Sequence, residues 1–159
     1  MREFGAIFVR AVLIVVGASV LGLGVNLVSP KGVPWIYVRP DIIEVDGVTI
    51  PIISEEKALG FLDDGETIFL DTRNAKDYAE SHIRGAVSLP EPKKEERFPT
   101  VEPVLPKDSR IVLYCTGPEC QMAEKVAAFL AKLGFENLML MPGGIEGWGK
   151  AGHPIERGQ

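Results

Sequence analysis

One strand–loop–helix unit constrains the fold of this chain more than any other feature. The run "RIVLYC", which ends at Cys115, is the most apolar short stretch of residues 54–159 and predicts a buried central strand. The loop "TGPECQ" follows, and apolar side chains then recur on one helical face: Met122, Val126, Phe129, Leu130 and Leu133. Gly134 is placed to end that helix. Such a unit is typical of an α/β domain with a mostly parallel sheet.

Shorter segments around this unit continue the alternation of strands and helices. The runs "TIFLD", "GAVSLP" and "NLMLM" are predicted extended segments, while "SEEKALGFLDDG" and "RNAKDYAESH" are predicted short helices. The charged, proline-rich stretch "EPKKEERFPTVEPVLPKDS" is predicted to be a surface connection, and "GGIEGWGKAGHP" a glycine-rich closing segment. With 46% hydrophobic residues, the chain has enough apolar side chains for a packed core. We therefore expect one α/β domain over residues 54–159.

The amino-terminal part has a different character, because no charged residue occurs from Ala11 to Pro30. At about 1.5 Å per residue in a helix, such a run reaches roughly 30 Å, the thickness of a bilayer core. Arg2 and Arg10 precede it, as in a signal peptide or a signal anchor, and the exit "GVNLVSPKG" has no convincing cleavage site. A cleaved signal and a buried core helix remain alternatives. The prediction is a transmembrane helix within residues 1–29, with the domain on the extracytoplasmic side, which is the periplasm in a bacterium.

Residues 30–53 are predicted to form a linker with short extended segments, in which "DGV" marks a tight hairpin turn. Without Arg2, Arg10 and Glu3, the remaining chain has 15 basic and 21 acidic side chains, a net charge of −6. An acidic surface without a basic stripe argues against nucleic acid as a partner.

Both cysteines of the chain lie in the loop after the predicted central strand. The carboxyl end of the strands is where ligands bind in open α/β sheets. Unpaired N–H groups of a curled loop, together with a helix N-terminus, can hold an anion and lower the pKa of a thiol. A reactive thiolate at Cys115, a disulfide with Cys120 and a packed thiol are all open at this point. Zinc is not expected, because C-x4-C spacing with the single distant histidines His82 and His153 is a poor ligand set.

Three motifs in order resemble the rhodanese-like domain family over about residues 54–157. The amino-terminal motif, "FLDTRNAKDYAESHIRGAVSLP", contributes Asp71, Arg73, Asp77, Tyr78, His82, Ile83, Gly85, Ala86 and Pro90. The carboxy-terminal motif, "GGIEGWGKAGHP", contributes Gly143, Gly144, Trp148, Gly152 and Pro154. Between them, "VLYCTGPECQMA" takes the place of the active-site loop of the family. The resemblance implies a three-layer domain, with a central mostly parallel sheet flanked by helices.

The resemblance also implies a single-domain sulfurtransferase that needs no cofactor. Cys115 would take sulfane sulfur from a small donor as a persulfide, and a thiol or redox protein would accept it. The implied substrate-binding residues are Arg73, Thr116, Gly117, Pro118, Glu119, Cys120 and Gln121. The implied structural residues are Asp71, Asp77, His82, Gly85 and Trp148, and for Arg73 a structural role is an open alternative.

The loop departs from the family pattern in its charge. Many members that use thiosulfate carry arginine, lysine or serine there, whereas residues 116–121 include no cation. The donor could be thiosulfate, polysulfide or a persulfide, but Glu119 would repel thiosulfate if it points inward, so only weak activity with thiosulfate is expected. Cys120 is instead placed to attack a persulfide on Cys115 and leave a disulfide, with incidental oxidation and a packed thiol as alternatives.

Two other functions are compatible with this fold. Dual-specificity phosphatases share it, but their C-x5-R loop requires an arginine where this chain has Gln121, which argues against phosphatase activity. The second alternative is a membrane-tethered module that senses redox state or binds a partner without turnover.

Overall fold

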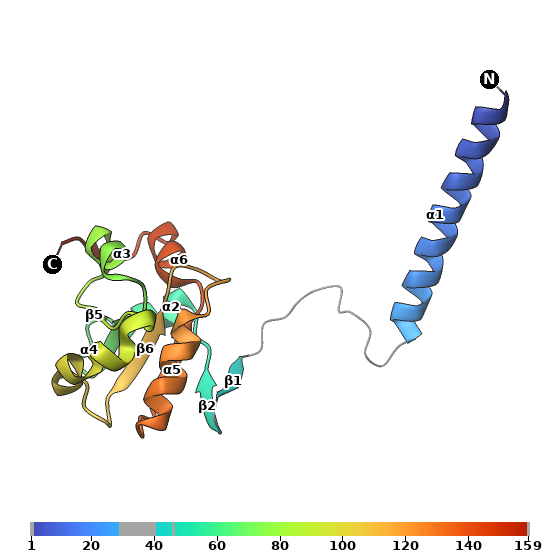
Figure 1. Cartoon of the computed structure of the whole chain (residues 1–159). Helices are drawn as coiled ribbons and strands as arrows, with labels where there is room; N and C mark the ends of the chain where they lie inside the picture. Colours follow the sequence, from blue (N-terminus) through green and yellow to red (C-terminus); the bar gives the residue numbers. More distant parts are fainter. Residues whose placement is uncertain (1, 29–40, 46, 159) are drawn as a thin grey trace. The chain divides into compact units, whose positions relative to one another are not determined.

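The computed structural model describes residues 2–28, 41–45 and 47–158, which belong to two units, Met1–Arg39 and Pro40–Gln159. The first contains a single described element, helix α1 (Arg2–Val28; Figure 1). Of the predicted linker, residues 30–53, residues 30–40 and 46 lie outside the described residues.

Helix α1 occupies the region in which a transmembrane span was predicted. A span needs about 20 consecutive, predominantly apolar residues to cross the hydrocarbon core. Within the described part of the chain, no helix combines that length with that apolarity. This finding does not support the predicted membrane anchor, and the extracytoplasmic location inferred from the anchor is wrong.

The second unit is built on a four-stranded parallel sheet with the strand order β5-β3-β6-β7. Its strands are β3 (Thr67–Asp71), β5 (Val87–Ser88), β6 (Arg110–Tyr114) and β7 (Leu138–Met141). β6 lies in the interior of the sheet, where Leu113 pairs with Leu70 on one side and Leu140 on the other. The predicted central strand is thereby confirmed.

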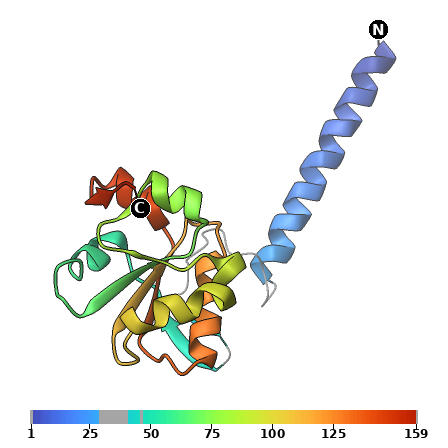
Figure 2. The same cartoon turned by 60° about the vertical axis from the view of Figure 1, so that its left-hand side comes forward.

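Helices cover both faces of the sheet, as the views in Figures 1 and 2 show. Alternate β6 side chains point to opposite faces: Ile111 and Leu113 pack with α4 (Lys94–Val101) and α5 (Met122–Lys132). Val112 and Tyr114 pack in a second cluster with α2 (Glu55–Leu59) and α6 (Gly144–Lys150). The three-layer α/β architecture is therefore confirmed.

An antiparallel hairpin extends the domain on the amino-terminal side. β1 (Ile42–Val45) pairs with β2 (Val48–Pro51), and Val45 opposite Val48 confirms the predicted hairpin, although Asp46 of its turn lies outside the described residues. Ile50 is fully buried in the core, and the Ile53 N–H donates to the Leu140 carbonyl at 2.8 Å. The hairpin is thus packed against the sheet domain.

Two helical segments were not predicted from the sequence. Residues 91–104, expected to be a surface connection, form the 3-10 helices η1 (Glu91–Lys93) and η2 (Glu102–Val104) with α4 between them. Phe98 and Val101 are buried there, because they lie three residues apart on one face. The other is α6, whose glycines have low helix propensity and whose stability comes from packing around the buried Trp148.

Two shorter elements complete the domain. Helix α3 (Ala75–Glu80) begins at Asn74, whose side chain accepts from the Asp77 N–H, and it confirms the second predicted short helix. β4 (His82–Ile83) follows and pairs antiparallel with β8 (Ile155–Glu156), which ties the carboxy-terminal segment to the domain.

Candidate active site

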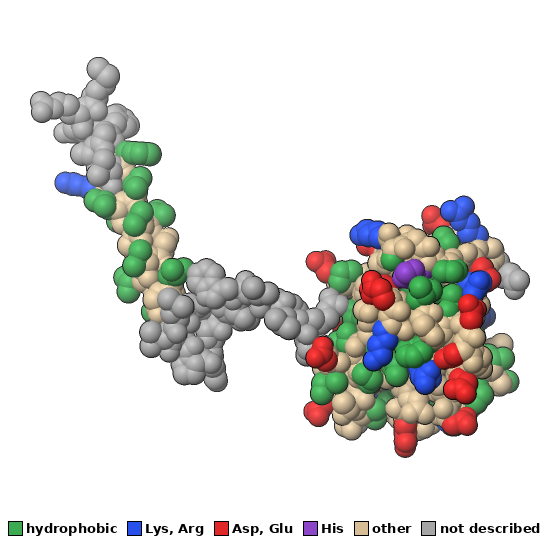
Figure 3. All heavy atoms as spheres, turned by 180° about the vertical axis from the view of Figure 1, so that it is seen from behind, with side chains coloured by type: hydrophobic (Ala, Val, Ile, Leu, Met, Phe, Trp, Pro, Cys, Tyr) green, Lys and Arg blue, Asp and Glu red, His purple; other side chains and the backbone are tan. Residues whose placement is uncertain are grey.

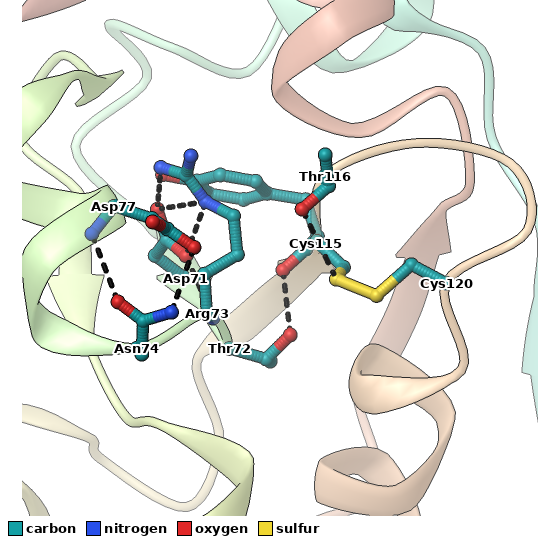
Figure 4. Close-up of a disulfide and its surroundings, with 9 residues drawn as sticks. Asp71, Thr72, Arg73, Asn74, Asp77, Cys115, Thr116 and Cys120 are labelled. Carbon is teal, nitrogen blue, oxygen red and sulfur yellow. Dashed lines mark hydrogen bonds and ion pairs between the residues drawn. A yellow bond between two sulfur atoms is a disulfide. The ribbon is translucent and has the colours of Figure 1, made fainter.

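Cys115 follows the last residue of β6 and lies at the carboxyl end of the central strand. It is 3% exposed and is joined by a disulfide to Cys120, with 6.2 Å between the two Cα atoms (Figure 4). The structure therefore shows the thiols paired. Thr116 contributes a hydroxyl, whose Oγ1 lies 3.9 Å from the Cys115 Sγ.

Backbone hydrogen bonds join the cysteine loop to the start of α6. The Ile145 N–H donates to the Cys115 carbonyl at 2.9 Å, and the Glu146 N–H donates to the Thr116 carbonyl at 3.0 Å. Gly144 adopts a φ of +60°, and a Cβ on it would collide with the Cys115 carbonyl oxygen and the Thr116 backbone. Glycine at this position is therefore required for the loop to approach α6.

The loop itself turns tightly before α5 begins. The Cys120 N–H donates to the Gly117 carbonyl at 3.0 Å, and the Gln121 carbonyl accepts from the Lys125 N–H at 3.2 Å. Pro118 has no N–H, and the Cys120 N–H is engaged within the turn. Neither of these two residues therefore offers a backbone N–H group to a bound anion.

A depression of about 440 Å³ opens beside the loop. It is lined by Thr116, Gly117, Pro118, Glu119, Cys120 and Glu146. Two of these residues carry negative charge and none carries positive charge. The Lys150 ammonium pairs with Glu146 at 3.9 Å, but both side chains are exposed and such a pair is weak in water. The depression is therefore an acidic environment for a ligand.

Arg73 is directed away from the disulfide (Figure 4). Its guanidinium donates from Nη2 and Nε to the buried Asp71 carboxylate, at 2.6 Å and 3.0 Å for the shortest bonds, and from Nη2 to the Ser81 carbonyl at 2.6 Å. Burial lowers the pKa of Arg73, but the bonds and charge of Asp71 outweigh that effect and raise it overall. The described contacts are those of a structural residue, and substrate binding by Arg73 stays a prediction.

The other signature residues also make structural contacts. The Asn74 amide donates to the Asp77 carboxylate at 2.8 Å, which completes the cap of α3. His82 is 4% exposed, and its Nδ1 lies 2.8 Å from the Tyr78 carbonyl oxygen. Gly85 adopts a φ of +72°, and the buried Trp148 donates from its indole N–H to the Pro154 carbonyl at 2.9 Å.

Two features of the site were missed in the sequence. Glu146 lines the depression although it lies thirty-one residues beyond Cys115, and only the folded position of α6 brings it there. Tyr114 was given no role in the sequence analysis, yet its hydroxyl accepts from the Ile83 N–H at 3.1 Å and bonds to Asp71. Successive side chains of a strand point to opposite faces of the sheet, and this alternation would have placed Tyr114 on the face opposite α5.

The fold and the loop position define a rhodanese-like domain. The rhodanese-like domain family matches residues 54–151 of the 159. The chain therefore belongs to that family, whose chemistry concerns the transfer of sulfur.

Curated relatives share only part of their length with this chain. A tRNA uridine(34) hydroxylase of Photorhabdus laumondii is 35% identical over 58% of this chain and 26% of its own length. The enzyme of the same name from Sodalis glossinidius is 33% identical over 68% of this chain and 33% of its own length. The chain thus spans about a quarter to a third of these relatives.

Solved structures are similar over the same domain. A protein of Bacillus halodurans has a TM-score of 0.59 and 36% identity, over 66% of this chain and 75% of its own. A thiosulfate sulfurtransferase of Pseudomonas aeruginosa has a TM-score of 0.55 and 26% identity, over 69% of this chain and 21% of its own.

Replacing Gly144 should damage the site through the backbone. Gly144→Ala forces a Cβ into a left-handed conformation and against the Cys115 carbonyl, so we expect a loss of about 1–3 kcal/mol in the free energy of unfolding. Gly149→Ala is the matched control, because nothing lies within 4 Å of its Cβ position and alanine favours a helix. Urea unfolding of both variants measures the difference. Equal stability of the two variants would contradict the role assigned to Gly144.

Alkaline pH should destabilise the domain through its buried tyrosine. Burial raises the pKa of Tyr114, and the nearby Asp71 charge raises it further. The unfolded chain therefore loses the phenol proton first, so this stability is present below about pH 10 and falls as pH rises above it. Tyr114→Phe should flatten that fall while lowering stability at neutral pH. Denaturant unfolding across alkaline pH tests the slope, and an unchanged slope in the variant would refute the assignment.

Proposed function

We propose that this domain is a sulfurtransferase that carries sulfane sulfur as a persulfide on Cys115. The observation that supports this most is the position of Cys115, which directly follows the central strand of a rhodanese-like domain, in a loop that is hydrogen-bonded to α6. A thiolate there attacks the outer sulfur of a donor and displaces the donor's leaving group. A thiol acceptor then removes the sulfur, so that one transfer becomes two easier steps.

The charges around the loop favour a thiol-borne donor over thiosulfate. Glu119 and Glu146 both line the depression beside the loop, to which Cys120 also contributes. A dianion such as thiosulfate would meet two carboxylates there, whereas a persulfide borne by a thiol of low charge would meet less repulsion. We therefore propose persulfide-type donors as the preferred substrates.

Modification of RNA is not part of this proposal. The name of the curated relatives refers to tRNA, but the shared segment is a minor part of their length. In Figure 3, basic and acidic side chains are interspersed over the face that is seen, and the basic ones form no continuous stripe. Nucleic-acid binding normally depends on such a stripe.

A second candidate is a redox-sensing domain without turnover, which the Cys115–Cys120 disulfide favours. In that case the thiols would cycle between paired and free states, and a partner protein would read the change. The two candidates differ in whether sulfur is ever bound to Cys115.

The decisive experiment is to look for that sulfur. The reduced full chain is incubated in turn with thiosulfate, polysulfide and glutathione persulfide, and then analysed by mass spectrometry. We expect one added sulfur on Cys115 in Cys120→Ser, where no second thiol can displace it, and none in Cys115→Ser. The absence of added sulfur from Cys120→Ser with all three donors would overturn the transferase proposal and leave the sensor.

Removing the carboxylates should improve the use of thiosulfate. Because each exposed charge contributes about 0.2–1 kcal/mol, Glu119→Gln and Glu146→Gln should each lower the apparent KM for thiosulfate by up to roughly fivefold. The effect should shrink as salt is added, since salt screens exposed charges. Glu136→Gln, an exposed carboxylate outside the lining of the depression, is the control. An unchanged KM in both variants would contradict electrostatic selection of the donor.

A further inference from the structure

We propose that Cys120 reduces the Cys115 persulfide and releases its sulfur as sulfide, so that the domain acts as a sulfane-sulfur reductase driven by an external dithiol. This inference rests on the proposed function, because it begins with the persulfide. It adds a catalytic residue, a product and a class of partner: a small redox protein or molecule with two thiols.

The fold places the two sulfur atoms for this step. The paired state shows that the Cys120 Sγ reaches the Cys115 Sγ within the native loop (Figure 4). The loop holds this arrangement at both ends, through the Cys115 carbonyl on α6 and the Cys120 N–H on Gly117. The inner sulfur of a persulfide on Cys115 is therefore within reach of Cys120 without rearrangement of the sheet.

Attack by Cys120 at the inner sulfur of the persulfide needs no external oxidant, because the outer sulfur accepts the electrons. The Cys120 thiolate bonds to the Cys115 Sγ, the bond from that Sγ to the outer sulfur breaks, and the outer sulfur leaves with the electron pair as hydrosulfide. Two cysteine thiols are oxidised to one disulfide while sulfane sulfur is reduced to sulfide. An external dithiol then reduces the disulfide by thiol exchange and becomes a disulfide itself.

The two cysteines differ in exposure, and this difference determines which sulfur of the disulfide the external dithiol attacks. Cys115 is 3% exposed, whereas Cys120 is half-buried and lines the open depression. The incoming thiolate can approach Cys120 more easily, because access decides which sulfur is attacked. Cys115 then leaves as a thiolate, ready for the next donor, and the mixed disulfide forms on Cys120.

Single turnover without a reductant tests the sulfide step. The reduced full chain is freed of reductant and mixed with one equivalent of glutathione persulfide, and sulfide and protein mass are followed together. We expect the wild type to release one equivalent of sulfide and end as the Cys115–Cys120 disulfide. Cys120→Ser should keep the sulfur on Cys115 and release little sulfide. Lys125→Ser, an exposed position on α5, is the matched control and should behave as the wild type does.

The outcomes separate this inference from the proposed function. Persulfide on Cys120→Ser, together with equal sulfide release from that variant and the wild type, would overturn the role of Cys120 and leave the transferase intact. No persulfide on Cys120→Ser would remove the transferase itself. Circular dichroism of each variant confirms that it is folded.

A trapping experiment tests which cysteine the external dithiol attacks. The oxidised wild type is mixed with a dithiol protein, such as a thioredoxin, whose second cysteine has been changed to serine, so that the mixed disulfide is trapped. Peptide mapping should find the partner on Cys120. A partner found on Cys115 would contradict the predicted direction.

Discussion

The buried Asp71 carboxylate is the constraint on which the domain depends. It ends β3 with no exposed surface, and it accepts hydrogen bonds from the Arg73 backbone N–H and guanidinium. Through Arg73 it reaches the carbonyl of Ser81, and through Tyr114 it reaches the N–H of Ile83. One carboxylate thus connects two neighbouring parallel strands with the segment that follows α3. A buried charge of this kind persists only because its partners surround it.

This ion pair and the cysteine loop belong to different faces of the sheet. Tyr114 points into the layer of α2 and α6, whereas Cys115, one residue later, belongs to the core under α5. The guanidinium of Arg73 is bonded to Asp71 and to the Ser81 carbonyl on the side of α2 and α6. The described contacts of the amino-terminal motif therefore join the strand ends to the segment that follows α3.

The sequence predicted those parts of the fold that follow from local periodicity. Strand β6 and helix α5 have strong apolar patterns, and both were found close to their expected bounds. Helix α6 was missed because its glycines have low helix propensity, and tertiary contacts rather than local sequence stabilise it. The expected transmembrane span relied on hydropathy alone. In the site, the loop residues were visible as a motif. Glu146 was not, since no local pattern links it to the loop.

The cysteine loop has no cation and contains a second thiol, and these two features affect the proposed chemistry in the same direction. Positive charge in the loop would favour an oxyanion donor, whereas the depression beside it is lined by Glu119 and Glu146. Electrostatics would therefore weaken the binding of anionic donors and would also help to expel hydrosulfide, an anion, once it has formed. In the proposed reaction, the carboxylates that would oppose thiosulfate would also favour the departure of hydrosulfide. The acidic rim and the second thiol are separate features, but both would favour reduction of sulfane sulfur over its transfer to an anionic acceptor.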